Sequence, residues 1–222
     1  MSVITISRQF GAGGKTLGRM ISAKMGYTLV DTEIIQMVAE KAKVSTQWVE
    51  SVEKEAGGKF LRFISGVVPK SLVDRVLDEK RGYIDEEIYV DLLHKIITKI
   101  ADEGEAVIIG RGGQYILQNR DDVYHLLLIG EKKDRIKFME KHYELTAKQA
   151  LQSVEMEDRR RTNLYRKFGK KDYDHPELYH LTLNMSKVDL DTACNLACKF
   201  VESRVAYKKH ITTGELLVDV WG

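Results

Sequence analysis

The chain has few cysteines, no excess of charge of one sign and no long hydrophobic run, and each absence excludes a class of protein. Its two cysteines, Cys194 and Cys198, are four residues apart in a helical pattern. We expect them to be small core side chains rather than a metal or redox site. The 35 basic and 33 acidic residues leave a net charge of +2. Any attraction for nucleic acid or an anionic membrane must therefore be local.

No apolar run approaches the roughly 18 residues that cross a bilayer, and the N-terminus has neither the basic flank nor the apolar stretch of a signal peptide. We therefore expect a cytoplasmic protein with no membrane partner. With 222 residues, 43% of them hydrophobic, the chain can bury the core of a single domain over residues 1–222. The sequence leaves the oligomeric state open, a homo-oligomer included.

Short apolar runs separated by helical patterns predict five strands, at residues 3–7, 27–30, 106–110, 125–130 and 178–184. Strands that alternate with helices join through right-handed crossovers into a parallel sheet covered on both faces. We therefore predict a doubly wound α/β fold with a five-stranded parallel sheet. Residues 32–104 have helical periodicity and are longer than a crossover needs, so we expect a helical insert there.

The segment "SRQFGAGGKT" lies between the first strand and the first helix, and it is a candidate phosphate-binding loop. The pattern G-x-x-x-x-G-K-[ST] requires glycine at position 9, where this chain has Gln9. Backbone N–H groups of a glycine loop that opens a helix point at phosphate oxygens, and the helix dipole adds to the attraction. A glycine turn needed only for tight packing has a similar sequence. We predict that phosphate is bound by Gly11, Ala12, Gly13, Gly14, Lys15 and Thr16.

Within this loop, Lys15 is expected to supply positive charge and Thr16 a hydroxyl ligand for Mg²⁺. Two other strand ends carry candidate substrate-binding residues, namely Asp31 with Thr32, and Arg111. Carboxyl ends of parallel strands converge beside the ligand crevice, where an arginine can grip an anion through two hydrogen bonds. The alternatives are that Asp31 or Thr32 only caps the next helix and that Arg111 is a solvated turn residue.

A basic segment precedes the last strand. Between Asp158 and Lys171 the chain has seven basic residues and one acidic residue. Such a run is typical of a solvated helix face and also of a nucleic-acid patch, which the near-neutral whole disfavours. Beside a phosphate loop, the run favours a lid over residues 152–176 that closes over a triphosphate and neutralises charge during transfer. Asp158 is expected to orient Arg161, three residues on.

Taken together, these segments resemble the cytidylate kinase-like family of P-loop nucleoside monophosphate kinases. The resemblance depends on the order and spacing of "ISRQFGAGG", "LVDTEII", "VIIGRGG" and "DRRRTNLYRKFG". It implies a P-loop kinase fold with ATP on the glycine loop, Mg²⁺, a monophosphate-binding insert and a basic lid. It also implies that Asp31 and Thr32 lie near the acceptor nucleotide and that Arg111 contacts the acceptor's phosphate. Arg160 and Arg161 resemble the lid arginines, and residues 184–186 resemble the strand that leads to the adenine.

Two departures from the family pattern leave alternatives open. Gly112 follows Arg111, where the cytidylate kinases have an aspartate that helps to place the nucleotide. In the opening loop, a one-residue insertion puts Lys15 on the family lysine, whereas an alignment without gaps puts Gly14 there. In the first alignment Lys15 reaches the β- and γ-phosphates. In the second, Arg8, Arg19 or a lid arginine must substitute, because phosphoryl transfer depends on positioned charge.

The sequence therefore predicts an ATP- and Mg²⁺-dependent kinase of a small molecule, with a nucleoside monophosphate as acceptor and catalytic roles for Lys15, Arg160 and Arg161. The alternative is a nucleotide-binding regulatory module with little or no turnover. The departures in the loop favour the module, and the basic lid favours the enzyme, because a sensor needs no clamp for the transition state.

Overall fold

The computed structural model describes residues 2–31, 86–169 and 174–213. Thr32, residues 33–85 of the predicted insert and residues 170–173 of the predicted lid lie outside the described residues. The rest of the predicted insert forms α6 (Glu86–Glu103), and the first part of the predicted lid belongs to α9 (Ala147–Lys167).

A five-stranded parallel sheet forms the centre of the fold. Its strands are β1 (Val3–Arg8), β2 (Thr28–Val30), β3 (Ala106–Ile109), β4 (Val123–Ile129) and β5 (Leu181–Asn184). Their order is β2-β3-β1-β4-β5, and every neighbouring pair is parallel. The predicted α/β class and all five strands are confirmed. The last strand begins later than predicted, because Pro176–Leu178 form a short 3-10 helix, η2.

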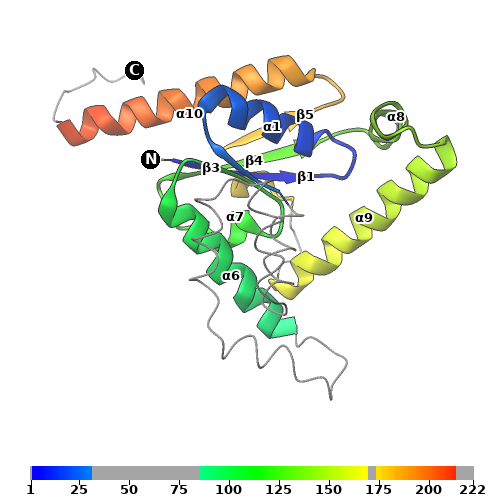
Figure 1. Ribbon diagram of the computed structural model, residues 1–222, viewed down its shortest axis with the longest axis horizontal. Coiled ribbons are helices and arrows are strands. Elements are labelled where there is room, and N and C mark those ends of the chain that lie inside the picture. Colours follow the sequence, from blue (N-terminus) through cyan, green and yellow to red (C-terminus); the bar gives the residue numbers. More distant parts are fainter. Residues whose placement is uncertain (1, 32–85, 170–173, 214–222) are drawn as a thin grey trace, which may run out of the picture.

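Helices cover both faces of the sheet, as Figure 1 shows. One face carries α1 (Gly14–Met25) and α10 (Leu190–Thr213), and the other carries α6 and the single turn α7 (Gly113–Ile116). Because both faces are covered, the strands are buried apolar runs rather than alternating ones. The core on the first face includes Ile4, Ile6, Leu17, Ile21, Leu126, Ala197 and Val201. The core on the second face includes Val3, Val30, Leu93, Ile97 and Ile108.

Cys194 and Cys198 are both buried in the core under α1 and α10, which confirms the expected core position of these two side chains. Within the three described ranges, no helix combines the length and the apolar character needed to cross a bilayer.

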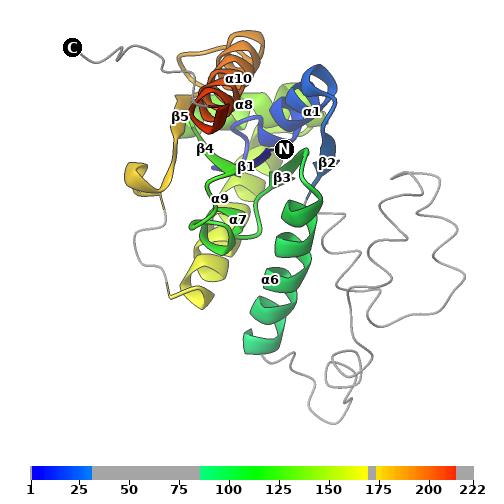
Figure 2. The same cartoon turned by 90° about the vertical axis from the view of Figure 1, so that its left-hand side faces the viewer.

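Two further helices, α8 (Lys132–Tyr143) and α9, extend beyond the sheet. They pack on each other through Met139, Ala150 and Val154. Thr146 caps α9 and exchanges hydrogen bonds with Gln149, which forms a capping box that fixes where the helix begins. Figure 2 shows that α9 lies on the same side of the sheet as α6 and α7, opposite α1 and α10. Residues 159–161, all arginines, lie on α9.

Candidate functional site

Residues 9–13 turn the chain from β1 into α1, and this glycine loop is tied to the end of β4. The Gln9 N–H donates to the Leu128 carbonyl (3.0 Å), and the Gln9 side-chain carbonyl accepts from the Gly130 N–H (3.0 Å). Gly11 and Gly13 have φ values of +83° and +79°, in the left-handed region that glycine adopts without strain. Gln9, the departure from the loop pattern, therefore has a structural role as a tether.

A second tether joins the loop to α8 and α9 through Arg135, a residue only 7% exposed. Its Nη1 donates to the Phe10 carbonyl (2.8 Å) and to Asp158 Oδ2 (2.9 Å), and its Nε donates to the Gly130 carbonyl (3.1 Å). The Phe10 N–H donates to Asp158 Oδ1 (3.3 Å). The structure differs here from the prediction that Asp158 orients Arg161, because Asp158 faces α8 and the loop.

The first turn of α1 faces the loop with its N-terminal end. Gly13 is the N-cap and has no side chain to accept from the N–H groups of that turn, and no acidic residue lies in the turn. Unsatisfied N–H groups and the positive end of the helix dipole together favour a bound anion. In the loop pattern the lysine directly follows the last loop glycine. Here α1 begins at Gly14, so Gly13 is the last glycine of the loop and Gly14, not Lys15, stands at the lysine position. The geometry therefore favours the alignment without gaps.

Lys15 is the second residue of α1, and its side chain points toward the end of β2. Its Nζ lies 3.2 Å from Asp31 Oδ2, and Asp31 is 8% exposed. This ion pair joins two residues that were predicted separately, one for ATP and one for the acceptor. The catalytic role predicted for Lys15 stays a prediction.

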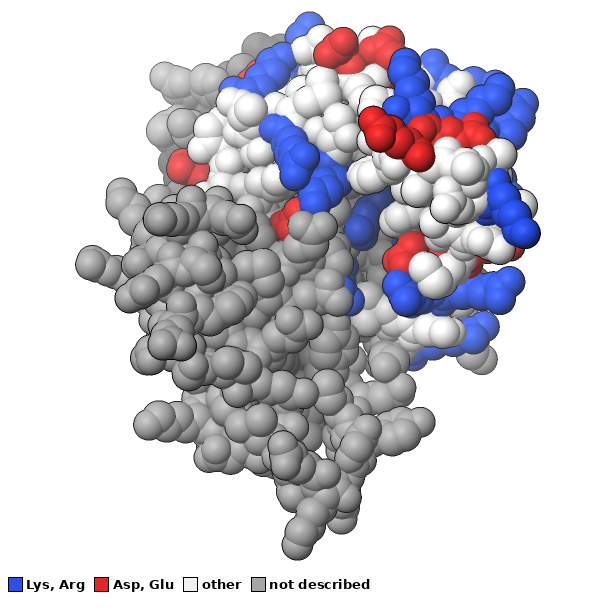
Figure 3. All heavy atoms as spheres, turned by 45° about the vertical axis from the view of Figure 1, so that its right-hand side comes forward, with Lys and Arg blue, Asp and Glu red and all other residues white. Residues whose placement is uncertain are grey.

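A cavity of about 660 Å³ lies over the carboxyl ends of the strands, a volume typical of small-molecule sites. Its walls come from β1, the glycine loop, α1, the ends of β2 and β3, α8 and α9. Figure 3 shows blue side chains on both sides of a hollow in this region and inside it. The structure brings the predicted residues together there, since the lining includes Gly11, Gly13, Gly14, Lys15, Thr16, Asp31, Arg111, Arg160 and Arg161. Ala12 lines a smaller cavity of about 200 Å³ beside the loop, with Phe138, Met185, Ser186 and Leu190.

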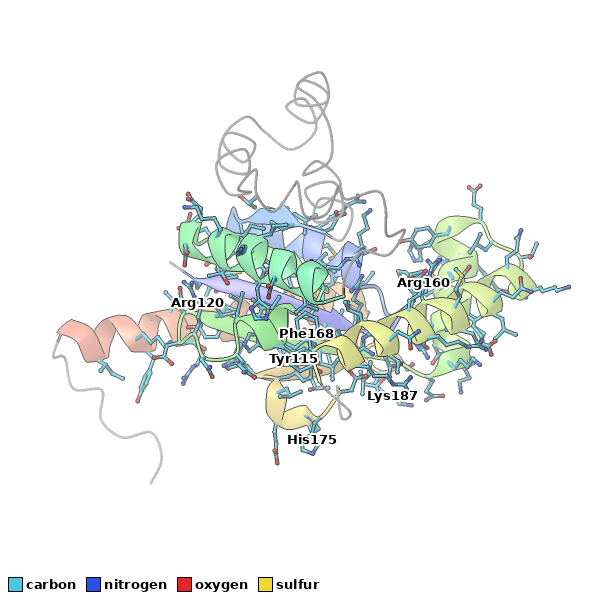
Figure 4. The ribbon with its side chains drawn as sticks, turned by 90° about the horizontal axis from the view of Figure 1, so that it is seen from below. Tyr115, Arg120, Arg160, Phe168, His175 and Lys187 are labelled. Carbon is cyan, nitrogen blue, oxygen red and sulfur yellow. The ribbon has the colours of Figure 1, made fainter. Side chains whose placement is uncertain are left out.

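The two lid arginines differ in how they are held. The Arg161 side chain is 12% exposed and forms a two-pronged ion pair with Asp174, with Nη1 2.9 Å from Oδ2. Its guanidinium lies 5.0 Å from the centre of the Tyr165 ring. The Arg160 side chain is 66% exposed and reaches Glu157 at 2.5 Å. Figure 4 shows Arg160 along α9, apart from Phe168 at the end of that helix. Arg161 is therefore preorganised, whereas Arg160 has room to move.

The end of β3 has an unusual backbone at Arg111. Its φ is +53°, between Gly110 at +74° and Gly112 at +75°, so three consecutive residues are left-handed. A Cβ at Gly112 would lie 2.7 Å from the Phe168 ring. That ring packs against Tyr115, with 5.9 Å between centroids, and Figure 4 shows both beside the end of α9. The glycine therefore lets the end of the lid helix approach the strand end.

Sequence reasoning missed three features of the site. Asp174, which holds Arg161, is 13 residues away along the chain, and Arg135, which anchors the loop, is 23 residues from Asp158. No local pattern marks either residue. The path of Arg8, whose side chain crosses Gly14, was also not predicted, although Arg8 was named as a substitute for the loop lysine.

Comparison with known proteins places this geometry in context. The sequence model of the cytidylate kinase-like family matches residues 3–187. No curated protein matches the chain. A solved structure of an uncharacterised protein from Eubacterium ventriosum ATCC 27560 is similar, with a TM-score of 0.63 and 20% identity over 91% of this chain and 98% of that one. A gluconokinase from Sinorhizobium meliloti 1021 has a TM-score of 0.51 and 12% identity over 95% of this chain and 97% of its own. At these identities the two structures establish a shared fold.

Proposed function

The chain belongs to the cytidylate kinase-like family, and from that premise we propose that it transfers the γ-phosphate of ATP to a small-molecule acceptor, with a nucleoside monophosphate as the acceptor. The observation that carries the proposal is the cavity of about 660 Å³, which combines the uncapped N-terminus of α1 with arginines from β1, from the end of β3 and from α9. Such a concentration of donors and positive charge suits two phosphorylated ligands.

The glycine loop and the first turn of α1 are the proposed binding site for the phosphates of ATP. Gly11, Gly13 and Gly14 allow close approach of the backbone, and the dipole of α1 attracts the negative charge. The smaller cavity on the other side of the loop is the proposed site of the adenine, since Phe138, Met185 and Leu190 supply apolar walls.

Mg²⁺ fits the oxygen donors at this end of the sheet, because Thr16 contributes a hydroxyl and Asp31 a carboxylate to the same cavity. When bound, the ion would neutralise part of the negative charge of the phosphates. We assign Thr16 as the metal ligand. The Asp31 carboxylate lies in the same cavity, where its ion pair with Lys15 holds it in place.

The acceptor is proposed to bind over the ends of β2 and β3. Arg111 supplies a guanidinium for the acceptor's phosphate, and Asp31 lies in the same cavity after the end of β2. The predicted contact of Thr32 with the acceptor concerns a residue outside the described ranges. The aspartate that cytidylate kinases have after this arginine is replaced by Gly112, and Phe168 occupies the space beside it. This replacement supports an acceptor whose base is not held by a carboxylate at position 112.

In the proposed reaction, an oxygen of the acceptor's phosphate attacks the γ-phosphorus of ATP in line with the leaving group. A new P–O bond forms, the bond between the γ-phosphorus and its bridging oxygen breaks, and ADP leaves. A phosphate acceptor is already ionised at pH 7, so the reaction needs no general base. Arg161, fixed by Asp174, stabilises the charge on the transferring group, and the exposed Arg160 of the predicted lid adds to it.

Incubation with ATP, Mg²⁺ and a panel of nucleoside monophosphates tests the proposal. We expect ADP and one matching nucleoside diphosphate above the blank, with the signal reduced in an Arg161→Met variant. If ATP binds measurably and no diphosphate forms with any acceptor, the protein is the nucleotide-binding regulatory module. The observations that favour this second function are the absence of a side chain at Gly14 and the ion pair of Lys15 with Asp31.

A further inference from the structure

Position 14 has no side chain, and the side chain of Arg8 lies across it. Gly14 is the first residue of α1. A Cβ at Gly14 would lie 2.8 Å from the Arg8 Cγ and 3.2 Å from its Cβ and Cδ. Real Cβ atoms do not approach other atoms so closely. A side chain at position 14 and the observed path of Arg8 therefore exclude each other.

The guanidinium of Arg8 reaches from the end of β1 to the end of β3. A Cβ at Gly110 would overlap the Arg8 Nη1 and lie 3.1 Å from its Cζ. Arg8 lines the same cavity as the glycine loop, Arg111 and Arg161. The side chain thus uses two missing Cβ atoms, at positions 14 and 110, to bring its charge into the cavity.

The charge environment of Arg8 favours an anion. Burial lowers the pKa of Arg8, and the positive charges of Arg161 and Arg111 act in the same direction, while Tyr165 and Glu157 act against them. An arginine stays protonated even so, because its ordinary pKa is far above neutral pH. Four arginines line this one cavity, and a bound polyanion would offset the repulsion between their charges. Lys15, the nearest lysine in sequence, directs its Nζ to Asp31 at the cavity's other wall.

We propose that Arg8 is the cation that holds the β- and γ-phosphates of ATP, in place of the lysine that the phosphate-loop pattern supplies. The inference rests on the proposed function and deepens it. A guanidinium presents parallel N–H donors to phosphate oxygens, so the replacement keeps the charge and adds a two-pronged contact. Arg8 can take this path only if position 14 is glycine, because a Cβ there would overlap the Arg8 side chain.

The first test compares Arg8→Met with Lys15→Met, two variants that each remove one positive charge near the loop. ATP and adenosine are titrated against each variant by calorimetry. We expect Arg8→Met to weaken ATP binding about tenfold or more, as loss of a charge-assisted contact does, with adenosine unaffected. Lys15→Met should change ATP affinity less than about threefold. If Arg8→Met binds ATP as wild type does, or Lys15→Met shows the large loss, the inference is overturned.

A rescue experiment separates a phosphate contact from a merely structural role. Arg8→Ala removes the charge and the Cγ that would lie 2.8 Å from a Cβ at position 14, and adding Gly14→Lys returns a lysine directly after the last loop glycine. We expect the double variant to regain most of the ATP affinity that Arg8→Ala loses, and Gly14→Lys alone to lower the melting temperature because the two side chains overlap. A folded double variant with no better ATP affinity than Arg8→Ala would contradict the proposal.

A measurement on the wild-type protein makes the test independent of variant folding. In a crystal structure with a non-hydrolysable ATP analogue, we expect the Arg8 guanidinium within hydrogen-bond distance of β- or γ-phosphate oxygens. Lys15 Nζ in that position, with Arg8 turned away, would overturn the inference and leave the proposed function standing. Wild-type protein that binds no ATP would overturn both.

Discussion

At the scale of single residues, the site depends on side chains held before any ligand arrives. Arg161 is the best example, because Asp174, Ser7 and Tyr165 all accept hydrogen bonds from its guanidinium. A preorganised donor stabilises developing charge without reorganising during the reaction. Asp174 is therefore a positioning residue for the proposed transfer, although it does not line the cavity.

Asp174→Asn weakens the hold on Arg161, and we expect kcat to fall about tenfold to a hundredfold with little change in ATP affinity. Steady-state kinetics with separate measurement of ATP binding checks this prediction. Glu177→Gln is the matched control, because it removes the same negative charge from a side chain that is 85% exposed and lies outside the cavity. Equal effects of the two variants on kcat would mean that Asp174 acts only through general charge.

The close approach of Gly112 to the Phe168 ring can be tested by a substitution. Gly112→Asp restores the aspartate of the family pattern, but its Cβ meets the Phe168 ring at 2.7 Å and its φ is +75°. We expect a loss of about 1–3 kcal/mol in the free energy of unfolding, as overpacking costs. Gly169→Asp is the control, since Gly169 has a similar φ of +70° and no atom within 4 Å of its Cβ position. Equal losses in urea unfolding would show that the overlap contributes nothing.

At the scale of elements, the glycine loop is positioned by helices that lie far from it in sequence. The Arg135–Asp158 pair joins α8 to α9 and holds both the N–H and the carbonyl of Phe10. Because the arginine is buried, breaking this pair leaves a charge without compensation. The Arg135–Asp158 pair thus connects the glycine loop to both α8 and α9.

Asp158→Asn is expected to lower the free energy of unfolding by about 1–3 kcal/mol, since Asp158 is 35% exposed, and to weaken ATP binding, because the loop loses its anchor. Thermal unfolding and ATP titration check both parts. Glu155→Gln is the control, since the Lys132–Glu155 pair also joins α8 to α9 but is exposed, at 51% and 41%. Such surface pairs contribute roughly 0–1 kcal/mol. An equally small effect of Asp158→Asn would contradict the anchoring role.

The central strands carry a pH-sensitive element. His125 Nδ1 of β4 lies 2.6 Å from the Thr5 hydroxyl of β1, and the backbone N–H of His125 donates to His180 Nδ1 beside β5. Burial, with a smaller effect of His180, lowers the pKa of His125 to about 4. The unfolded chain, with an ordinary pKa near 6.5, therefore binds more protons between those values.

Stability should accordingly be complete above about pH 6.5 and fall as the pH drops toward 4, by about 3 kcal/mol over that window. Urea unfolding at pH 7.0 and pH 5.0 measures the slope. His125→Gln should flatten it, with a remainder from His180, whose pKa burial also lowers. An unchanged slope in His125→Gln would assign the acid sensitivity to other groups.

At the scale of the whole molecule, the features that could be predicted from the sequence are those that local residue patterns determine. Buried parallel strands are apolar runs, so all five were found, and Asp31 and Arg111 follow from their place at strand ends. The partner of Arg135 was not predictable, because it depends on how α8 packs on α9, and the partner of Arg161 was not predictable, because Asp174 follows the end of α9. The path of Arg8 depends on two missing Cβ atoms, at Gly14 and Gly110, which are 96 positions apart in the sequence.

The proposed function requires that the residues of this cavity transfer the γ-phosphate of ATP to an acceptor. Phosphorus NMR of ATP and Mg²⁺ with a pool of nucleoside monophosphates, followed over time with wild-type protein and with Arg161→Met, tests it most directly. We expect the γ-phosphate signal of ATP to disappear as β-phosphate signals of ADP and of a second diphosphate appear, far more slowly with the variant. An ATP spectrum that stays unchanged in the presence of protein that binds ATP would contradict it.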